Sequence, residues 1–377
     1  MPAEDGPDVV VTGYAAFSVF GPGVDALMDG VLAGRAAFTS VRRFDVSTMH
    51  VRVAATWDDG GVDAASDAED IFRACAAEAL DSAGVSEPER YALIAATKLS
   101  SAAAAGPTAG MAERVSAKFG LGRPRRVFVN ACVAGASAII YAAQLIRAGL
   151  CDGAVVGSSY LVDRQVFAEF DAVRGLADDG RLRPFDRSRT GVLLGDACGV
   201  LVLESISAAR ARAAPVIGRI VGWALTNDAF HMVQPRPDGG GVAAAITRAL
   251  TSAGLDPASL GGLGYINAHG TGTVLNDRAE ALAIRSALGA AADGVAVSST
   301  KGATGHGLEG CGALEAVITL ESLRRGLLPP NASLSDPDPT CPVNLIAGAP
   351  RPASAQYALS LNSSVGGLNS ALLLESA

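Results

Sequence analysis

Four side chains with the chemistry of nucleophiles, bases and charge stabilisers stand in glycine-rich stretches of this sequence. Cys132 lies in VFVNACVAGASA, between an apolar, strand-like run and a helical pattern of small residues. His269 lies in NAHGTGTVLND, and His306 follows Lys301 by five residues in STKGATGHGLEGCGALE. The positive end of a helix dipole lowers the pKa of a thiol and so makes a nucleophilic thiolate available. Glycines beside the histidines would let a substrate arm approach the backbone closely.

Other interpretations of the same residues stay open at this point. Cys132 is compatible with a small buried hydrophobic residue, and a single histidine is often structural. Neither histidine has a Cys or His partner at zinc spacing, so we expect no metal site. No G-x-S-x-G follows a strand, and GTGT lacks the GK[ST] ending of a phosphate loop. A Cys–His protease also fits these residue types.

The composition describes a chain with a large apolar core and a moderate negative charge. Of the 377 residues, 49% are hydrophobic and 18% are charged. Aromatic residues make up only 5%, whereas there are 44 glycines, which favours packing by close backbone approach. The formal net charge of −8 leaves no broad basic face, so we do not expect nucleic acid as a partner.

The termini and cysteines predict a cytoplasmic protein. The N-terminal stretch MPAEDGPDVVVTG is acidic and lacks the basic and apolar regions of a signal peptide. No apolar run is long enough to span a membrane, so we expect no membrane partner. The six cysteines form no CxxC pair, which is typical of reduced thiols inside the cell.

The second half of the chain repeats features of the first half. ALDSAGVS from Ala79 resembles ALTSAGLD from Ala249, and each ends a helical pattern with a glycine C-cap. GASAIIYAAQLIRAGL from Gly135 matches GALEAVITLESLRRGL from Gly312, with equally spaced glycines at both ends. VVVTGYA near Val9 is similar to RIVGWAL. Three pairs in the same order indicate a duplicated α/β unit.

The duplication predicts the domain organisation and the place of the site. We expect two halves, 1–212 and 213–377, because a short alanine-rich connector lies near 205–218. The first half carries an additional stretch at about 20–61. The β–α alternation predicts largely parallel sheets covered on both faces. Ligands bind such folds where strands lead into helices, and Cys132 lies at one of these switches. STKGATGHGLEGCGALE occupies the equivalent switch of the second half.

The chain as a whole resembles a known family. It is similar to the elongating β-ketoacyl-acyl-carrier-protein synthases of fatty acid and polyketide synthesis, members of the thiolase superfamily. The resemblance rests on motifs that follow one another in the same order: VVVTGYAAFSVFGPG, NACVAGASA, RPFDRSRTGVLLGDACGVLVLE, NAHGTGTVLNDRAE, STKGATGHGLEGCGALE and LNSSVGGLNSALLLE. It implies a thiolase-like fold, in which two similar α/β halves are stacked in five layers, αβαβα.

The resemblance also implies a role for each motif residue. Cys132 would accept the acyl chain as a thioester, and His269 and His306 would promote decarboxylation of a malonyl unit and stabilise its enolate. Lys301 would support this site electrostatically. Glu315 would order the site. The backbone N–H of Val365 would join that of Cys132 in the oxyanion hole. Three further residues would contact the substrate arm: Thr271, Thr273 and Ser363.

The closing glycine loop departs from the family pattern. Relatives commonly read NSFGFGGTN, whereas this chain reads LNSSVGGLN. With the glycines aligned, the two phenylalanines fall on Ser363 and Val365. Loss of the aromatic ring at Val365 would widen the mouth of the acyl pocket, and a shift of one residue would place Ser364 there instead.

The motif around His306 departs as well. Glu309 and Cys311 stand where small residues are usual. A carboxylate at Glu309 would either raise the pKa of the histidines or simply face water. These changes favour a specialised polyketide or secondary-metabolite enzyme over a housekeeping fatty-acid enzyme.

The predicted reaction is a decarboxylative Claisen condensation between an acyl group on Cys132 and a malonyl-acyl carrier protein. One alternative is a ketosynthase-like acyltransferase that passes the acyl group to another nucleophile without decarboxylation. Another is a non-catalytic partner resembling a chain-length factor, although retention of Cys132 with both histidines argues against it.

The same resemblance predicts the cofactor and the partners. We expect no resident cofactor, because the carrier protein supplies the phosphopantetheine arm. The carrier would dock on the basic stretch GRPRR, with Arg123, Arg125 and Arg126. The chain would form a homodimer, or a heterodimer with a ketosynthase-like subunit.

Overall fold

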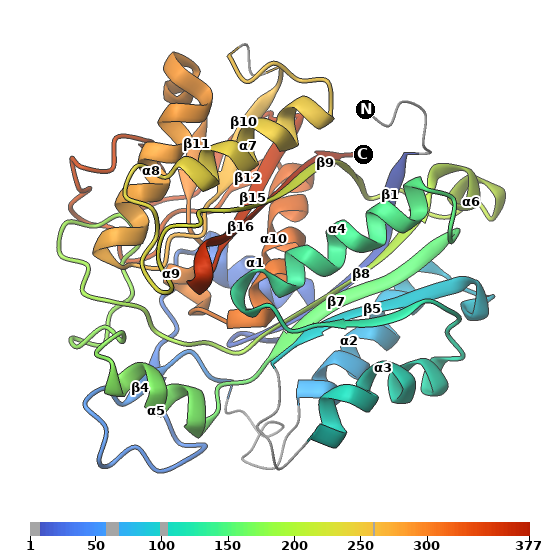
Figure 1. The fold of residues 1–377 in the computed structure, drawn as a ribbon, viewed down its shortest axis with the longest axis horizontal. Helices are drawn as coiled ribbons and strands as arrows, with labels where there is room; N and C mark the ends of the chain where they lie inside the picture. Colours follow the sequence, from blue (N-terminus) through green and yellow to red (C-terminus); the bar gives the residue numbers. More distant parts are fainter. Residues whose placement is uncertain (1–7, 58–67, 99–104, 259–260) are drawn as a thin grey trace.

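The computed structural model describes residues 8–57, 68–98, 105–258 and 261–377. Its large sheet contains two sets of five strands with the same order, β1-β8-β7-β5-β6 and β9-β16-β15-β10-β11 (Figure 1). The first set consists of β1 (Val9–Ser18), β8 (Ala197–Ser205), β7 (Gly153–Tyr160), β5 (Tyr91–Thr97) and β6 (Arg125–Phe128). The second consists of β9 (Gly218–Asn227), β16 (Leu368–Ser376), β15 (Tyr357–Ser363), β10 (Leu263–Asn267) and β11 (Ala296–Ser298). An antiparallel pairing of β1 with β9 joins the two sets.

The strand directions confirm the duplication but not a largely parallel sheet. In each set the first two neighbouring pairs are antiparallel and the next two are parallel. The expectation of a largely parallel sheet was therefore wrong. In the second half the reason is local: β16 follows β15 after a short glycine turn, and such a turn can join only antiparallel neighbours.

Helices form three layers around the two strand sets (Figure 1). The central layer consists of α4 (Ala134–Arg147) and α10 (Cys311–Arg325), which contact each other and strands of both sets. The first set is covered on its outer face by α2 (Ala68–Ala83) and α3 (Ala105–Phe119), and the second by α7 (Gly240–Ser252) and α8 (Val274–Leu288). The predicted five-layered αβαβα arrangement is confirmed.

The repeated glycines have two structural roles. Gly84 and Gly254 follow α2 and α7 with φ of 63° and 72°, as expected for helix C-caps. Gly135 and Gly312 lie where α4 and α10 cross. A Cβ on Gly312 would lie 2.3 Å from the backbone nitrogen of Ala136, so no larger residue fits there. The small residues after Cys132 therefore let the central helices touch through their backbones.

The additional stretch of the first half contributes to the site. It contains β2 (Gly21–Pro22), α1 (Val24–Leu32), β3 (Thr39–Ser40) and β4 (Val53–Ala54), and its residues 58–61 lie outside the described ranges. Val41, Met49 and Val51 from this stretch share one buried apolar cluster with Cys132. The insertion thus forms part of the buried surroundings of Cys132.

The remaining elements are short. They are α5 (Arg164–Ala172), α6 (Ile206–Ala211), α9 (Lys301–Thr304), β12 (Leu327–Leu328), β13 (Asn344–Leu345) and β14 (Arg351–Pro352). Within the described ranges, no helix combines the length and apolar character that crossing a bilayer requires.

Candidate active site

Cys132 lies at a constrained turn between β6 and α4. The short 3-10 helix η3 (Ala131–Val133) leads directly into α4. Ala131 has φ of 55°, a left-handed conformation that is uncommon for a residue with a Cβ and is often found at functional sites. The Cys132 side chain is only 9% exposed. The turn thus presents the thiol to the interior of the molecule rather than to bulk water.

The thiol of Cys132 does not have the low pKa that its place before a helix suggested. Burial, reinforced by the negative charge of Glu309, raises the pKa to about 12. Lys301 and the hydroxyl of Ser364 act in the opposite direction but do not offset the loss of water around the thiolate. The resting thiol is therefore protonated at neutral pH, and it must lose its proton before it can act as a nucleophile.

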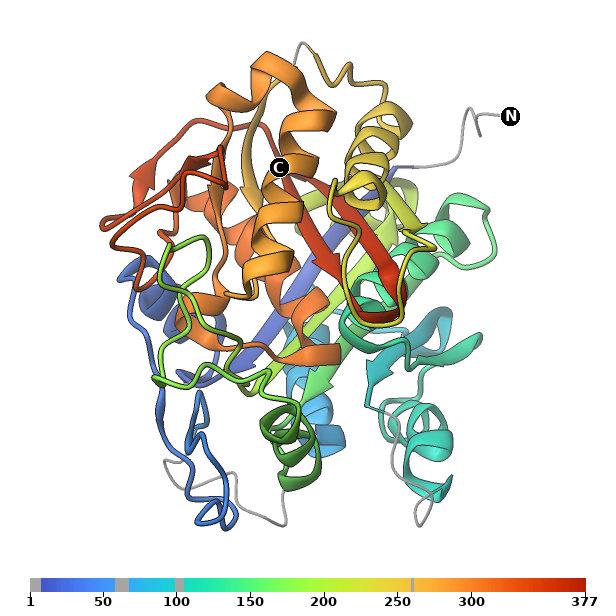
Figure 2. The same ribbon diagram turned by 60° about the vertical axis from the view of Figure 1, so that its left-hand side comes forward.

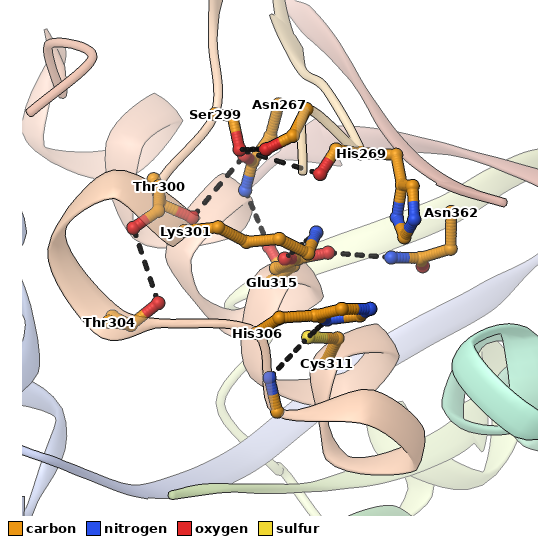
Figure 3. Close-up of polar contacts among 12 residues, drawn as sticks. Asn267, His269, Ser299, Thr300, Lys301, Thr304, His306, Cys311, Glu315 and Asn362 are labelled. Atoms are coloured by element: carbon orange, nitrogen blue, oxygen red, sulfur yellow. Dashed lines mark hydrogen bonds and ion pairs between the residues drawn. The ribbon is translucent and has the colours of Figure 1, made fainter. Parts of the chain in front are cut away.

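Both candidate histidines come from the second half of the chain. His269 follows β10, and His306 lies between α9 and the short 3-10 helix η5 (Leu308–Gly310). Their rings meet edge to face, with centroids 5.3 Å apart (Figure 3). Burial lowers the pKa of both well below 6.5, and the positive charge of Lys301 adds to this effect. Both imidazoles are therefore neutral at pH 7 and can donate hydrogen bonds.

A buried ion pair lies beside the two imidazoles. Nζ of Lys301 is 2.5 Å from Oε1 of Glu315, and Nδ2 of Asn362 donates to Oε2 of Glu315 at 2.6 Å (Figure 3). Burial is the largest single influence on Lys301 and disfavours its ammonium, but the charge and hydrogen bond of Glu315, together with other nearby acidic groups, outweigh burial and raise the pKa of Lys301. Because the pair is shielded from water, its field on the imidazoles is weakly screened. Asn362 was not among the residues predicted from the sequence.

The fold brings these groups together because η3 packs against η5, α10 and β15. The effects of Lys301 and Glu309 on the pKa of Cys132 show that charges of the second half act on the thiol of the first. Thr271 and Thr273 lie between β10 and α8, with their hydroxyl oxygens 3.0 Å apart. The remaining candidate, Ser363, ends β15 and is partly buried.

Glu280 holds the loop that carries His269, and sequence reasoning missed it. Its Oε1 accepts the backbone N–H of His269 at 2.6 Å, and its Oε2 accepts that of Gly270 at 2.8 Å. Burial raises the pKa of Glu280 to about 7, although these two N–H groups oppose the shift. Its place in the motif NAHGTGTVLNDRAE was the available signal, but only the fold shows that this side chain turns back onto the loop.

The closing loop places Ser364, rather than the side chain of Val365, next to the thiol of Cys132. Val365 is exposed, with 56% of the residue's surface open to solvent. The buried hydroxyl of Ser364 acts on the thiol of Cys132 and has no regular hydrogen bond within the described residues. The loop is tied to the loop 228–239, because the N–H of Gly366 donates to the carbonyl of Met232 at 2.7 Å (Figure 2). For the side chains, these positions agree with the shift of one residue, whereas the backbone N–H of Val365 stays the candidate for the oxyanion hole.

An aromatic ring should therefore narrow the pocket at position 364 and not at 365. We expect Ser364→Phe to lower the loading of wide relative to narrow acyl donors by about tenfold, since overpacking a closed site costs roughly 1–3 kcal/mol. Val365→Phe, the matched control, should keep the parent ratio. The measurement is a competition between branched and straight-chain donors, analysed by intact-protein mass. If only Val365→Phe changes the ratio of wide to narrow donors loaded, the unshifted alignment is correct and Val365 lines the pocket.

Glu309 neither faces water nor raises the pKa of the histidines. Its side chain is buried, and burial raises its own pKa. Its Oε2 has no hydrogen-bond partner within the described residues. The negative charge of Glu309 instead raises the pKa of two residues of the first half, Cys132 and Tyr160. Within the same ranges, no group of three or more His, Cys, Asp or Glu side chains is arranged to hold a metal ion.

Comparison with known proteins agrees with this geometry. The family description "Beta-ketoacyl synthase, N-terminal domain" matches residues 53–209, and "Beta-ketoacyl synthase, C-terminal domain" matches residues 217–335. The 3-oxoacyl-[acyl-carrier-protein] synthase 2 of Synechocystis sp. is 40% identical over 268 residues, which are 69% of this chain. The chain spans only 64% of the length of that relative.

Two further relatives cover nearly the whole chain. The tetracenomycin polyketide synthase ketoacyl synthase alpha subunit of Streptomyces glaucescens is 32% identical, over 97% of this chain and 96% of that protein. The solved structure of the ishigamide ketosynthase/chain length factor superposes with a TM-score of 0.90 at 28% identity, over 99% of this chain and 100% of the other. These matches confirm the predicted thiolase-like ketosynthase fold. The chain belongs to the beta-ketoacyl synthase family.

Proposed function

We propose that this chain joins a Cys132-bound acyl group to the enolate formed by decarboxylation of a malonyl-acyl carrier protein. The observation that carries the proposal is that η3, which holds the Cys132 thiol of the first half, packs against η5, which closely follows His306 of the second. The ring of His306 meets that of His269, and both imidazoles are buried and neutral. A nucleophile suits covalent capture of an acyl group, and neutral N–H donors suit a developing enolate. The same pairing supports the proposed roles of Cys132, His269 and His306.

In the first half-reaction, the sulfur of Cys132 attacks the thioester carbonyl of an acyl group on the phosphopantetheine arm of the carrier. A new carbon–sulfur bond forms, the old one breaks, and the thiol proton passes to the departing arm. The proton transfer is required because the buried thiol is protonated at rest. We assign the oxyanion hole to the backbone N–H groups of Cys132 and Val365, which would stabilise the tetrahedral oxyanion.

In the second half-reaction, a malonyl-carrier occupies the same site. Its carbon–carboxylate bond breaks, carbon dioxide leaves, and the electron pair forms an enolate that accepts hydrogen bonds from His269 and His306. The enolate carbon then attacks the thioester on Cys132 and releases the thiolate. The positive charge of Lys301, which is held in place by Glu315, would further stabilise the negative charge of the enolate. Thr271, Thr273 and Ser363 would hold the substrate arm.

The decisive experiment supplies the chain with an acyl donor and a ¹³C-labelled malonyl-carrier protein. Condensation predicts one labelled carbon dioxide for each β-ketoacyl-carrier formed. Acyl transfer to another nucleophile without carbon dioxide would support the acyltransferase alternative. Absence of any acyl-enzyme would support a non-catalytic, chain-length-factor-like partner. The acyl groups that load would also test the assignment to polyketide or secondary metabolism.

We also propose the partners and the setting of the reaction. The acyl carrier protein would bring the phosphopantetheine arm, so the chain would need no cofactor of its own. The name of the ishigamide complex supports a heterodimer with a ketosynthase-like subunit, and a homodimer is the alternative. Strand β6 ends the large sheet, with Val129 exposed just beyond it, which leaves an edge for a second subunit. The six free thiols favour the cytoplasm, and we assign the two halves to 1–212 and 213–377.

The basic stretch before β6 is only partly free for a carrier protein. Nε and Nη2 of Arg125 donate to the carbonyls of Gly122 and Leu121 at 3.1 and 2.9 Å, so this guanidinium holds a turn. Arg123 and Arg126 are exposed. The predicted docking surface is therefore reduced to these two residues.

We expect Arg123→Glu/Arg126→Glu to slow loading from an acidic acyl carrier protein by about tenfold at low ionic strength, with a smaller effect at high salt. Loading from a small acyl thioester should not change. Arg210→Glu/Arg248→Glu, which reverses two exposed charges elsewhere, is the matched control. Equal carrier affinity in both double variants would place the docking surface elsewhere.

A further inference from the structure

The thiol of Cys311 contacts the catalytic machinery, yet the proposed reaction gives it no role. Cys311 is the first residue of α10 and its side chain is 2% exposed. Its Sγ accepts the backbone N–H of Gly307 at 3.1 Å and lies 3.2 Å from Nδ1 of His306 (Figure 3). Small residues are usual at this place in the family pattern, so the thiol–imidazole contact distinguishes this chain.

The protons around this contact can be assigned from the partners of each atom. Burial raises the pKa of Cys311 well above 9, so the thiol keeps its proton. Because the imidazole of His306 is neutral, it carries one proton, on Nδ1 or on Nε2. A proton on Nδ1 would make Sγ accept two N–H groups and would leave the S–H to find another acceptor.

The carboxylate of Glu315 is a competing acceptor for the thiol proton, and each of its oxygens already accepts one other hydrogen bond. The carboxylate of Glu315 lies one helical turn further along α10. Its negative charge raises the pKa of Cys311, and a hydrogen bond from Cys311 opposes the rise that burial causes in the pKa of Glu315. However, Oε1 of Glu315 accepts from Lys301 at 2.5 Å and Oε2 accepts from Asn362 at 2.6 Å. Nδ1 of His306 lies 3.2 Å from Sγ and is the side-chain acceptor with a regular contact to this thiol among the described residues, so we take it as the acceptor of the thiol proton.

We infer that Cys311 is a positioning residue whose S–H donates to Nδ1 of His306 and thereby keeps the ring proton on Nε2. The inference rests on the proposed function, in which the N–H of His306 stabilises the enolate. A neutral imidazole has a single N–H, and the partner of one nitrogen decides which nitrogen carries it. Cys311 thus prepares His306 as a donor before the substrate arrives.

His269 has no equivalent partner. Its Nδ1 is buried and has no hydrogen bond within the described residues. No described side chain therefore selects its tautomer, and a bound substrate can do so. The two histidines, which look alike in sequence, are then unequal: the tautomer of His306 is set by the protein, whereas that of His269 is not.

The test measures the tautomer directly in the full chain. ¹⁵N-histidine NMR of the parent should show Nδ1 of His306 unprotonated and Nε2 protonated, with the signals assigned by loss in His306→Gln. Cys311→Ser, which keeps a donor and an acceptor, should preserve this spectrum. Cys311→Ala should shift it towards the Nδ1–H form. Malonyl decarboxylation should slow about tenfold in Cys311→Ala, the size expected for one hydrogen bond, and recover in Cys311→Ser.

Acyl loading of Cys132 should be equal in all three proteins, which separates positioning from general damage to the fold. An Nδ1–H tautomer in the parent would overturn the inference, because the thiol proton would then point elsewhere. So would an unchanged tautomer and decarboxylation rate in Cys311→Ala, since the N–H of Gly307 would then suffice. The NMR result needs no turnover. A parent that never decarboxylates malonyl-carrier would therefore refute the proposed function while leaving the tautomer assignment measurable.

Discussion

Cys132→Ala should yield no acyl-enzyme, and condensation should fall by a factor on the order of 10⁶, as when other enzymes lose a covalent nucleophile. In the proposed reaction the thiol of Cys132 is the covalent acceptor, and the other buried thiol of the site, Cys311, already contacts His306. Decarboxylation of malonyl-carrier should stay measurable, because that step depends on the imidazoles. Intact-protein mass after incubation with acyl-carrier detects the first effect, and release of labelled carbon dioxide detects the second.

The matched control for this variant is Cys151→Ala. Cys151 is more exposed than the other five cysteines, which are buried, so it is the thiol most open to non-specific acylation. Burial and Asp152 raise its pKa to about 11, and it should not compete with Cys132. Its loss should leave the acyl-enzyme mass at the parent level. A normal acyl-enzyme in Cys132→Ala would refute the nucleophile, and Cys311 and Cys198 would become the residues to test.

His306→Ala and His269→Ala should each slow condensation by about 100- to 1,000-fold, the loss typical of one donor to a developing oxyanion. Acyl loading should fall much less, because the enolate forms only in the second half-reaction and interactions made only there affect only that step. The two half-reactions are measured separately, by acyl-enzyme mass at early times and by labelled carbon dioxide from malonyl-carrier.

The two histidine variants have a matched control in a third histidine. His231→Ala, which changes a histidine on an exposed loop, should leave both half-reactions at parent rates. If His306→Ala and His269→Ala slow loading as much as condensation, the histidines maintain the shape of the site instead. Thermal melting of each variant then distinguishes a folded, inactive site from an unfolded protein.

Much of the candidate site was predictable because its reactive residue types lie in short, local motifs. Cys132 before a helix of small residues, and His269, Lys301 and His306 in glycine loops, were identifiable from residue type and spacing. The duplication was predictable for the same reason. Matched glycines such as Gly135 and Gly312 recur because two equivalent helices need the same close approach, and the structure places them at one crossing.

Other features could not be found in the sequence, because they depend on burial and on partners that are distant along the chain. The dipole argument predicted a low pKa for Cys132, but enclosure by the insertion and by Glu309 raises it. Glu280 and Asn362 are ordinary polar residues until folding aims them at His269 and Glu315.

The amino-acid sequence was sufficient to specify which side chains can react and that two similar halves must carry them, since both follow from residue type and local periodicity. Only the tertiary structure decided their protonation and their partners. The thiol and imidazoles are neutral because packing removes water from them, and the contact of Cys311 with His306 exists because α10 begins next to that ring. Removal of water and side-chain proximity are properties of the packed chain, and no short segment contains them.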